Sequence, residues 1–140
     1  VLDGVLSLRL TRNTGAVFGL GDGWQWLFIA VSVIAAGVIL RLFWVSRADA
    51  TVTHLALALI LAGDLGNLYD RVVFFHVRDM LHLLPDTTLP FGWRWFSGAR
   101  GLWPWIFNLA DAALMLGVGL VLVITWRNER RARSAESAPS

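Results

Sequence analysis

Residues 23–40 read GWQWLFIAVSVIAAGVIL, a run of 18 residues without a charged side chain. Arg41 interrupts the run, and the apolar sequence Leu-Phe-Trp-Val follows it. About 20 apolar residues in a helix span the hydrocarbon core of a bilayer. The stretch therefore predicts a membrane-spanning helix at about 24–45, with a basic end near Arg41 whose side chain reaches the headgroups.

Two later stretches have the same character. Residues 53–71 begin as an uncharged run rich in Ala and Leu and end in a polar segment. Residues 104–126 contain a single charged residue, Asp111. Together the three stretches predict an integral membrane protein of mainly α class, a small bundle with spans at about 24–45, 53–71 and 104–126.

The overall composition leads to the same class. Of the 140 residues, 56% are hydrophobic and 16% are charged, and the mean hydropathy is +0.61. Soluble domains carry about 25% charged residues. The values argue against a soluble enzyme, a disordered chain and a nucleic-acid-binding protein, and the length allows one domain. Without Cys there is no disulfide or thiolate site, and His54, His76 and His82 lack metal-ligand spacing, so no metal is expected.

Two segments outside the predicted spans differ in pattern. Residues 5–13 alternate apolar and polar side chains, which is typical of a half-buried strand. Residues 72–104 are interrupted by Pro and Gly and rich in Trp, which predicts a long loop near the membrane interface. Residues 82–104 of this loop are expected to form a mobile lid over the functional site.

The distribution of arginine predicts an orientation. Residues 127–140 begin with a cluster of Arg directly after the third span: Arg127, Arg130, Arg131 and Arg133. Positive charges next to a span favour the cytoplasmic side. We therefore expect a disordered, basic cytoplasmic tail at 127–140. The membrane domain at 1–126 then has its strand at 5–13 and its loop at 72–104 on the extracytoplasmic side.

Four acidic residues lie in or beside the predicted spans: Asp64, Asp70, Asp79 and Asp111. Placing an ionisable group near lipid costs about 2.5–3.5 kcal/mol, so each is a functional-site hypothesis. Asn108 shares a helix face with Asp111, and Asn67 shares one with Arg71. We expect these two polar faces to meet at the extracytoplasmic end of the bundle.

The residues alone leave other interpretations open. Asp70 fits an ion pair or a helix cap beside Arg71, and Asp64 can also pair with Arg71. Asn67 and Asn108 can join two helices by hydrogen bonds worth about 1 kcal/mol each. A proton or ion pathway and a non-catalytic, degenerate membrane assembly protein remain alternatives. A pathway needs polar residues along the whole span, however, and residues 26–40 and 112–126 have almost none.

Four motifs occur in order: residues 13–18 read NTGAVF, 65–71 read LGNLYDR, 76–80 read HVRDM and 107–111 read FNLAD. Together, over about 1–126, they resemble the lipoprotein signal peptidases (signal peptidase II), a family of intramembrane aspartic endopeptidases. The resemblance implies a small helical bundle with an extracytoplasmic strand region. It also implies removal of signal peptides from bacterial prolipoproteins in the inner membrane, by cleavage before a diacylglyceryl-modified Cys.

The resemblance implies roles for individual residues. It makes Asp79 and Asp111 the catalytic pair. It gives supporting or substrate-binding roles to Asn13, Gly15, Asn67, Asp70, Arg71, Asn108 and Ala110. No metal and no organic cofactor is expected, the partners are prolipoproteins and membrane lipid without nucleic acid, and the protein is expected to be a monomer.

The sequence departs from the family in four respects. The family has four spans, and its first span has no counterpart before residue 1, so we expect a truncated chain. Asp64 stands where a small residue is usual, and Arg78 stands where Val is usual. The interval from Asp79 to Asp111 is long, which makes residues 82–104 resemble an insertion.

Overall fold

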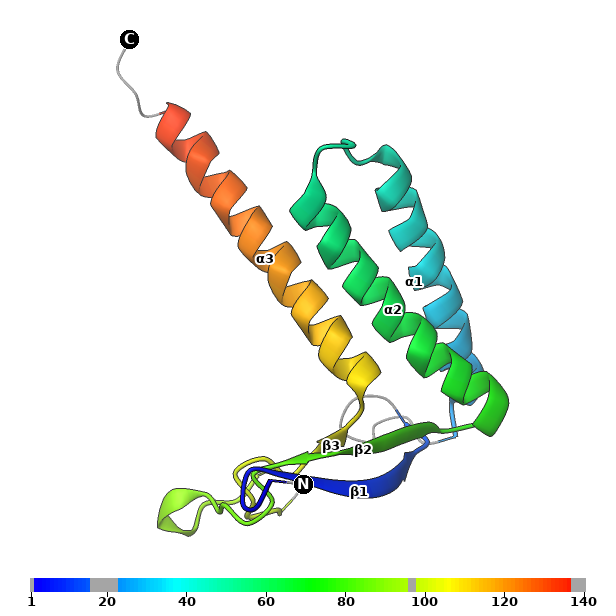
Figure 1. Ribbon diagram of the computed structural model, residues 1–140, viewed down its shortest axis with the longest axis vertical. Coiled ribbons are helices and arrows are strands. Elements are labelled where there is room, and N and C mark those ends of the chain that lie inside the picture. The colour runs from blue at the N-terminus through cyan, green and yellow to red at the C-terminus, as the bar shows by residue number, and fades with distance from the viewer. Residues whose placement is uncertain (1, 16–22, 96–97, 137–140) are drawn as a thin grey trace.

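The computed structural model describes residues 2–15, 23–95 and 98–136. Figure 1 shows three long helices side by side and a small sheet lying across one end of them. The helices are α1 (Gln25–Val45), α2 (Thr51–Phe74) and α3 (Leu109–Glu136). All three are long and apolar enough to cross a membrane. The predicted class, a membrane-embedded and mainly α-helical bundle with a short β region, is confirmed.

Helix α2 lies between the other two helices and contacts both. Only Ser32 and Ile39 of α1 are buried, which is expected for a helix that is apolar on all sides and faces lipid. In contrast, the half of α2 that is nearer the sheet buries charged side chains, namely those of Asp64, Asp70 and Arg71. The polar face of α2 therefore points into the protein.

Helices α2 and α3 approach closely at glycines. A Cβ atom built on Gly117 of α3 would lie 2.7 Å from the carbonyl oxygen of Ala56. A Cβ atom on Gly63 of α2 would collide with the carbonyl oxygen of Ala110. Small residues at membrane helix contacts allow backbones to approach in this way. This close packing brings the start of α3 against the polar face of α2.

The sheet has three antiparallel strands in the order β1 (Leu6–Asn13), β2 (Val77–Leu83) and β3 (Ile106–Phe107). Leu8 pairs with Leu81, but the next pair is Thr11 with Asp79, so β1 contains one extra residue. Such a bulge changes which side chains share a face. Leu6 and Leu8 share a face of the sheet with Asp79, and simple alternation along 5–13 would put Asn13 on the opposite face. The extra residue moves Asn13 to the face of Asp79.

Three expected boundaries were wrong. Residues 72–104 are not all loop, because α2 continues to Phe74 and β2 occupies 77–83. The third helix starts at Leu109 instead of 104, because Ile106 and Phe107 pair with β2 and Asn108 caps the helix. The tail is helical through Glu136 and not disordered there, because residues 127–136 contain no Gly or Pro and are rich in Arg and Ala, which favour helix.

Candidate active site

Asp79 lies in β2, where exposure alternates along the strand. Val77 and Asp79 are buried, whereas Arg78 and Met80 are exposed. Only 3% of Asp79 is exposed. The side-chain amide of Asn13 donates to its Oδ2 at 3.0 Å, and that of Asn108 donates to its Oδ1 at 2.9 Å. Two neutral donors from different elements therefore hold the Asp79 carboxyl group.

Asp111 is fixed by the first turn of α3. Its backbone N–H donates to Oδ1 of Asn108 at 2.9 Å, and the backbone N–H of Asn108 donates to Oδ2 of Asp111 at 3.1 Å. This reciprocal pair is a capping box, which satisfies N–H groups left free at a helix start. The side-chain amide of Asn67 on α2 donates to Oδ1 of Asp111 at 2.8 Å.

Asn108 joins the two acidic residues. Its side-chain amide donates to Asp79 and, at 3.0 Å, to Oδ1 of Asn67, while its backbone donates to Asp111. Each of the four carboxylate oxygens thus accepts one hydrogen bond from a neutral donor. A carboxylate oxygen has two lone pairs, so each keeps capacity for water or a substrate N–H.

Arg71 brings a positive charge to this cluster. It is buried, and its Nη2 donates to the carbonyl oxygen of Gly15 at 3.1 Å. The N–H of Gly15 donates to Oδ1 of Asn13 at 3.1 Å, and the guanidinium carbon of Arg71 lies 5.2 Å from the centroid of the Phe28 ring. Arg71 therefore ties α2 to the end of β1 and, through Asn13, to Asp79.

The surroundings of Asp79 favour its protonated form. Burial raises the pKa of the Asp79 carboxyl group above its usual range, and the nearby charge of Asp111 raises it further. The hydrogen bonds from Asn13 and Asn108 and the charge of Arg71 act against this rise in pKa. Two interacting carboxyl groups in a buried site share a proton for the same reason.

Asp70 has a partner that the sequence did not suggest. Its carboxylate binds Arg78, with Oδ1 at 2.8 Å from Nη2, and its Oδ2 accepts the backbone N–H of Arg78 at 2.9 Å. The structural interpretation as an ion pair holds, but the cation is Arg78 of β2 instead of the adjacent Arg71. The pair fixes the end of α2 to the start of β2.

Asp64 lies outside this hydrogen-bond network. It is buried in α2, and its hydrogen-bond partner is Ser32 of α1 rather than Arg71. Its Oδ2 has no hydrogen-bond partner within the described residues. Asp64 therefore belongs to the contact between α1 and α2.

A cavity of about 280 Å³ is lined by Asn67 and Asn108, which hydrogen-bond the two acids, but not by Asp79 or Asp111 themselves. It is lined by residues of α2, β2 and the start of α3: Gly66, Asn67, Tyr69, Asp70, Arg78, Met80, Asn108, Leu109 and Ala110. In residues 2–15, 23–95 and 98–136 no group of three His, Asp or Glu side chains is arranged to hold a metal ion.

The structure brings together most of the residues singled out from the sequence. Asn13, Asn67 and Asn108 hydrogen-bond Asp79 or Asp111 directly. Arg71 and Gly15 reach Asp79 indirectly, because Arg71 donates to Gly15 and Gly15 donates to Asn13, and Ala110 packs against α2. Asp70 lies at the edge of the cavity in its ion pair. The other residues of the first motif, 16–18, lie outside the described residues.

Comparison with known proteins gives consistent results. Residues 1–127 match the family model described as signal peptidase (SPase) II. A lipoprotein signal peptidase of Shouchella clausii is 37% identical over 134 residues, which is 94% of this chain and 78% of the relative. One of Geobacter sulfurreducens is 40% identical over 134 residues, covering 94% of this chain and 75% of the relative.

Solved structures agree in fold. A bacterial membrane enzyme determined at 2.3 Å resolution superposes with a TM-score of 0.77 at 24% identity, covering 100% of this chain and 74% of the other. A second bacterial membrane enzyme, at 1.9 Å resolution, gives 0.71 at 26% identity, with 89% and 72% covered.

The fold and the site define a small membrane-embedded protein in which one asparagine holds two carboxyl groups at one end of a helical bundle. The chain belongs to the signal peptidase II family, as its four motifs predicted.

Proposed function

We propose that this chain removes signal peptides from diacylglyceryl-modified prolipoproteins in the bacterial inner membrane, with Asp79 and Asp111 as its catalytic residues. The observation that carries the assignment is the position of the two acids. Both are hydrogen-bonded by Asn108, at the end of the bundle where the helices meet the sheet. A lipid-modified peptide stays in the bilayer, so its cleavage site also lies near this boundary.

Peptide hydrolysis needs an activated water and a protonated leaving nitrogen. In the proposed mechanism the ionised carboxyl group takes a proton from water, which attacks the scissile carbonyl carbon. The protonated carboxyl group polarises the carbonyl oxygen and then donates its proton to the amine. Neither acid is assigned a fixed acid or base role in this mechanism.

The remaining residues support the two acids. Asn13, Asn67 and Asn108 orient the carboxyl groups with neutral donors, which leaves the charge of the pair available for proton transfer. Arg71 donates a hydrogen bond to the Gly15 carbonyl oxygen, and its positive charge favours the ionised form of Asp79.

The rival pairing of Asp70 with Asp111 is less favourable. Asp70 binds the Arg78 guanidinium through both of its carboxylate oxygens, and an opposite charge of this kind keeps a carboxyl group ionised. A shared-proton pair needs one member that keeps its proton, which favours Asp79. A proton pathway is also less favourable, because Asp111 lies in the first turn of α3 and Asp79 lies on β2, while the spanning helices are largely apolar.

The proposed orientation places the sheet outside the cytoplasm and the end of α3 inside it, with prolipoproteins and lipid as partners. We propose that the protein acts as a monomer, because residues of one chain supply both acids and all of the side chains that hold them.

Replacement of each acid tests the assignment. Asp79→Asn and Asp111→Asn should each reduce cleavage of a diacylglyceryl-prolipoprotein by at least about 10²–10⁴-fold, because Asn is isosteric but cannot accept or share the proton. The double variant should be little worse than either single variant, since members of a catalytic unit are not additive. Cleavage is followed by the gel shift of the substrate, with protein level and thermal stability measured in parallel.

Asp70→Asn is the matched control. It breaks the ion pair with Arg78. It should therefore lower the melting temperature clearly, and any loss of turnover should be no larger than that loss of stability explains. Wild-type turnover by purified Asp79→Asn would overturn the assignment and transfer the catalytic role to Asp70.

A further inference from the structure

The loop between β2 and β3 has its own internal structure. The backbone N–H of Leu89 donates to the carbonyl oxygen of Arg100 at 2.8 Å, and Thr88 pairs with Gly101. The indole N–H of Trp95 donates to the carbonyl oxygen of Gly101 at 2.8 Å. The loop is therefore a folded projection from the sheet.

The aromatic residues of this loop form two groups. Those near the sheet pack against one another, with ring centroids 4.5 Å apart for Trp95 and Trp105 and 5.6 Å apart for Trp103 and Trp105. Those at the tip face outward, since Phe91 is 91% exposed and Trp93 is 68% exposed. Packing within the loop explains the first group but not the second.

The backbone conformation at the tip of the loop is unusual for a residue as large as Phe91. The 3₁₀ turn η2 (Pro90–Gly92) gives Phe91 a φ of 57° and Gly92 a φ of 70°. A bulky side chain rarely adopts positive φ, where Gly or Asn is preferred. A strained position occupied by an exposed Phe points to a contact outside the loop.

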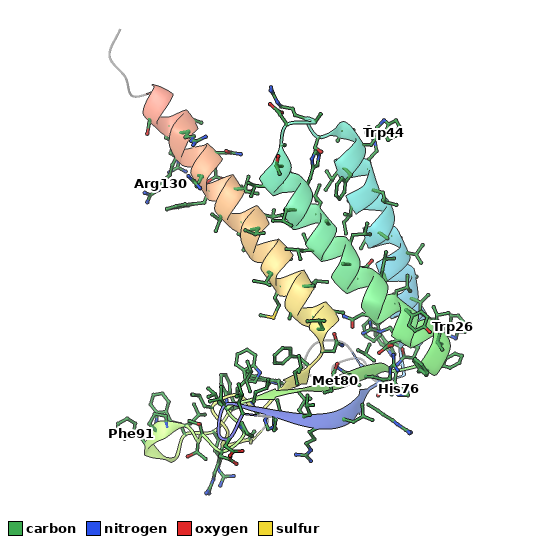
Figure 2. All side chains as sticks on the ribbon, viewed as in Figure 1. Trp26, Trp44, His76, Met80, Phe91 and Arg130 are labelled. Atoms are coloured by element: carbon green, nitrogen blue, oxygen red, sulfur yellow. The ribbon has the colours of Figure 1, made fainter. Side chains whose placement is uncertain are left out.

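The position of the tip identifies the medium that surrounds it. Exposed Trp26 lies at the sheet end of α1 and exposed Trp44 at its other end (Figure 2). Trp24, which is also exposed, directly precedes the first residue of α1. Trp residues gather at the two membrane–water boundaries, so one boundary passes at the level of the sheet. Figure 2 places Phe91 to the side of the helices, at the end of the loop farthest from Met80. A loop tip that lies beside the helices at the level of this boundary faces the surface of the bilayer.

We propose that residues 90–94 are a lipid-surface anchor, in which Phe91 and Trp93 enter the boundary between headgroups and acyl chains on the sheet side of the membrane. The charges of the loop fit this partner. Arg94 and Arg100 are exposed and Asp86 is its single acid, so the loop is cationic and favours anionic headgroups. The anchor holds the sheet against the bilayer and is independent of the proposed catalytic chemistry.

The absence of Cys makes a direct test possible, because one introduced Cys carries a single nitroxide label. Phe91→Cys is compared with two references. Ile34→Cys is in the apolar helix α1, where Ile34 is 66% exposed, and Asp86→Cys is at an exposed position of the same loop as Phe91. The labelled chain of residues 1–140 is reconstituted in nanodiscs of phosphatidylcholine and phosphatidylglycerol. Accessibility is measured to oxygen, which concentrates in lipid, and to a water-soluble nickel chelate.

The label at 91 should show an oxygen-to-nickel accessibility ratio shifted from that of position 86 toward that of position 34. Arg94→Gln with Arg100→Gln, or nanodiscs of phosphatidylcholine alone, should reduce this shift. A ratio at 91 equal to that at 86 places the tip in water and overturns the proposal. Exclusion of both reagents at 91 also overturns it, because the tip then packs against protein, either a second copy or its own active site. Lipid-like values at 34 in every sample show that the helices are inserted.

Discussion

Asn108 makes three hydrogen bonds with the two acids: its side-chain amide donates to Asp79, its backbone N–H donates to Asp111, and its side-chain oxygen accepts from the backbone N–H of Asp111. Its side-chain amide also donates to Asn67. No other amino acid supplies two side-chain N–H donors and a carbonyl acceptor on so short a chain; Gln carries the same groups one methylene further out. A carboxylate at this position would add a charge beside the pair and remove both donors. The chemistry of this one position therefore determines how the two acids are spaced.

The hydrogen bond from Asn13 predicts a change in pH dependence. Asn13 stabilises ionised Asp79 and so lowers its pKa against the effect of burial. Asn13→Ala removes that donor, so the pKa of Asp79 rises and the pair keeps its shared proton to higher pH. The alkaline limit of kcat/KM should then move to higher pH.

Ser7→Ala is the control for this measurement, because Ser7 lies on the same strand and pairs with His82, away from the acids. Its pH profile should match that of the unaltered protein. An alkaline limit that stays in place or moves to lower pH in Asn13→Ala would contradict the assigned role of Asn13.

Helical spacing made part of the site predictable. Asn108 with Asp111, and Asn67 with Arg71, share faces because i+3 and i+4 neighbours do so in any helix. The partner of Asp70 was not predictable in this way. Adjacent positions suggested Arg71, but Arg71 is turned toward Gly15, and Arg78 reaches Asp70 from the following strand. A pair between two elements depends on where the chain turns, which spacing along one element does not reveal.

Among the helices, the contact between α2 and α3 depends on Gly117. A Cβ at Gly117 would lie 2.6 Å from a side-chain carbon of Ile60, whereas a Cβ at Gly119, two residues along the same helix, meets nothing within 4 Å. Gly117→Ala should therefore destabilise the protein by about 1–3 kcal/mol through overpacking. Because α3 carries Asp111, its displacement should also reduce kcat.

Gly119→Ala serves as the matched control, and its higher helix propensity should leave stability unchanged or raise it by up to about 1 kcal/mol. Thermal unfolding in detergent and cleavage of a lipid-modified substrate measure the two effects. Equal melting temperatures for the two variants would show that α2 and α3 do not rely on close backbone contact at Gly117.

Composition revealed the three helices because a spanning segment needs a long apolar run whatever its partners are. It failed at their ends. Ile106 and Phe107 are as apolar as the helix that follows, so only their pairing with β2 distinguishes them as β3. The bulge in β1 was equally hidden, since the sequence gives no local sign that Arg9 and Leu10 together will lie opposite the single residue Met80.

At the scale of the molecule, the ends of the helices differ in charge. Helix α3 carries exposed Arg127, Arg130 and Arg131 beyond Trp126, which is 53% exposed. At 1.5 Å per residue, the 21 residues of α1 form a helix about 30 Å long, which matches a bilayer core. The charged end of α3 therefore lies past the membrane boundary opposite the sheet.

Reporter fusions test the orientation. Green fluorescent protein fused after residue 140 should fluoresce and alkaline phosphatase fused there should be inactive, because clustered Arg favours the cytoplasm. Alkaline phosphatase inserted in the loop before β3 should be active. Changing Arg127, Arg130, Arg131 and Arg133 to Gln should increase the inverted fraction. An active phosphatase at the C-terminus of the unaltered chain would refute the proposed orientation.

The capping box at the start of α3 has a consequence for biosynthesis. Asn13, Asn67 and Asp79 all leave the ribosome before Asn108 and Asp111, so the pair of acids is incomplete until the last helix begins to form. The hydrogen bonds that nucleate that helix are the same ones that align its acid. On the proposed function, the pair of acids can therefore act only after the first turn of α3 has formed.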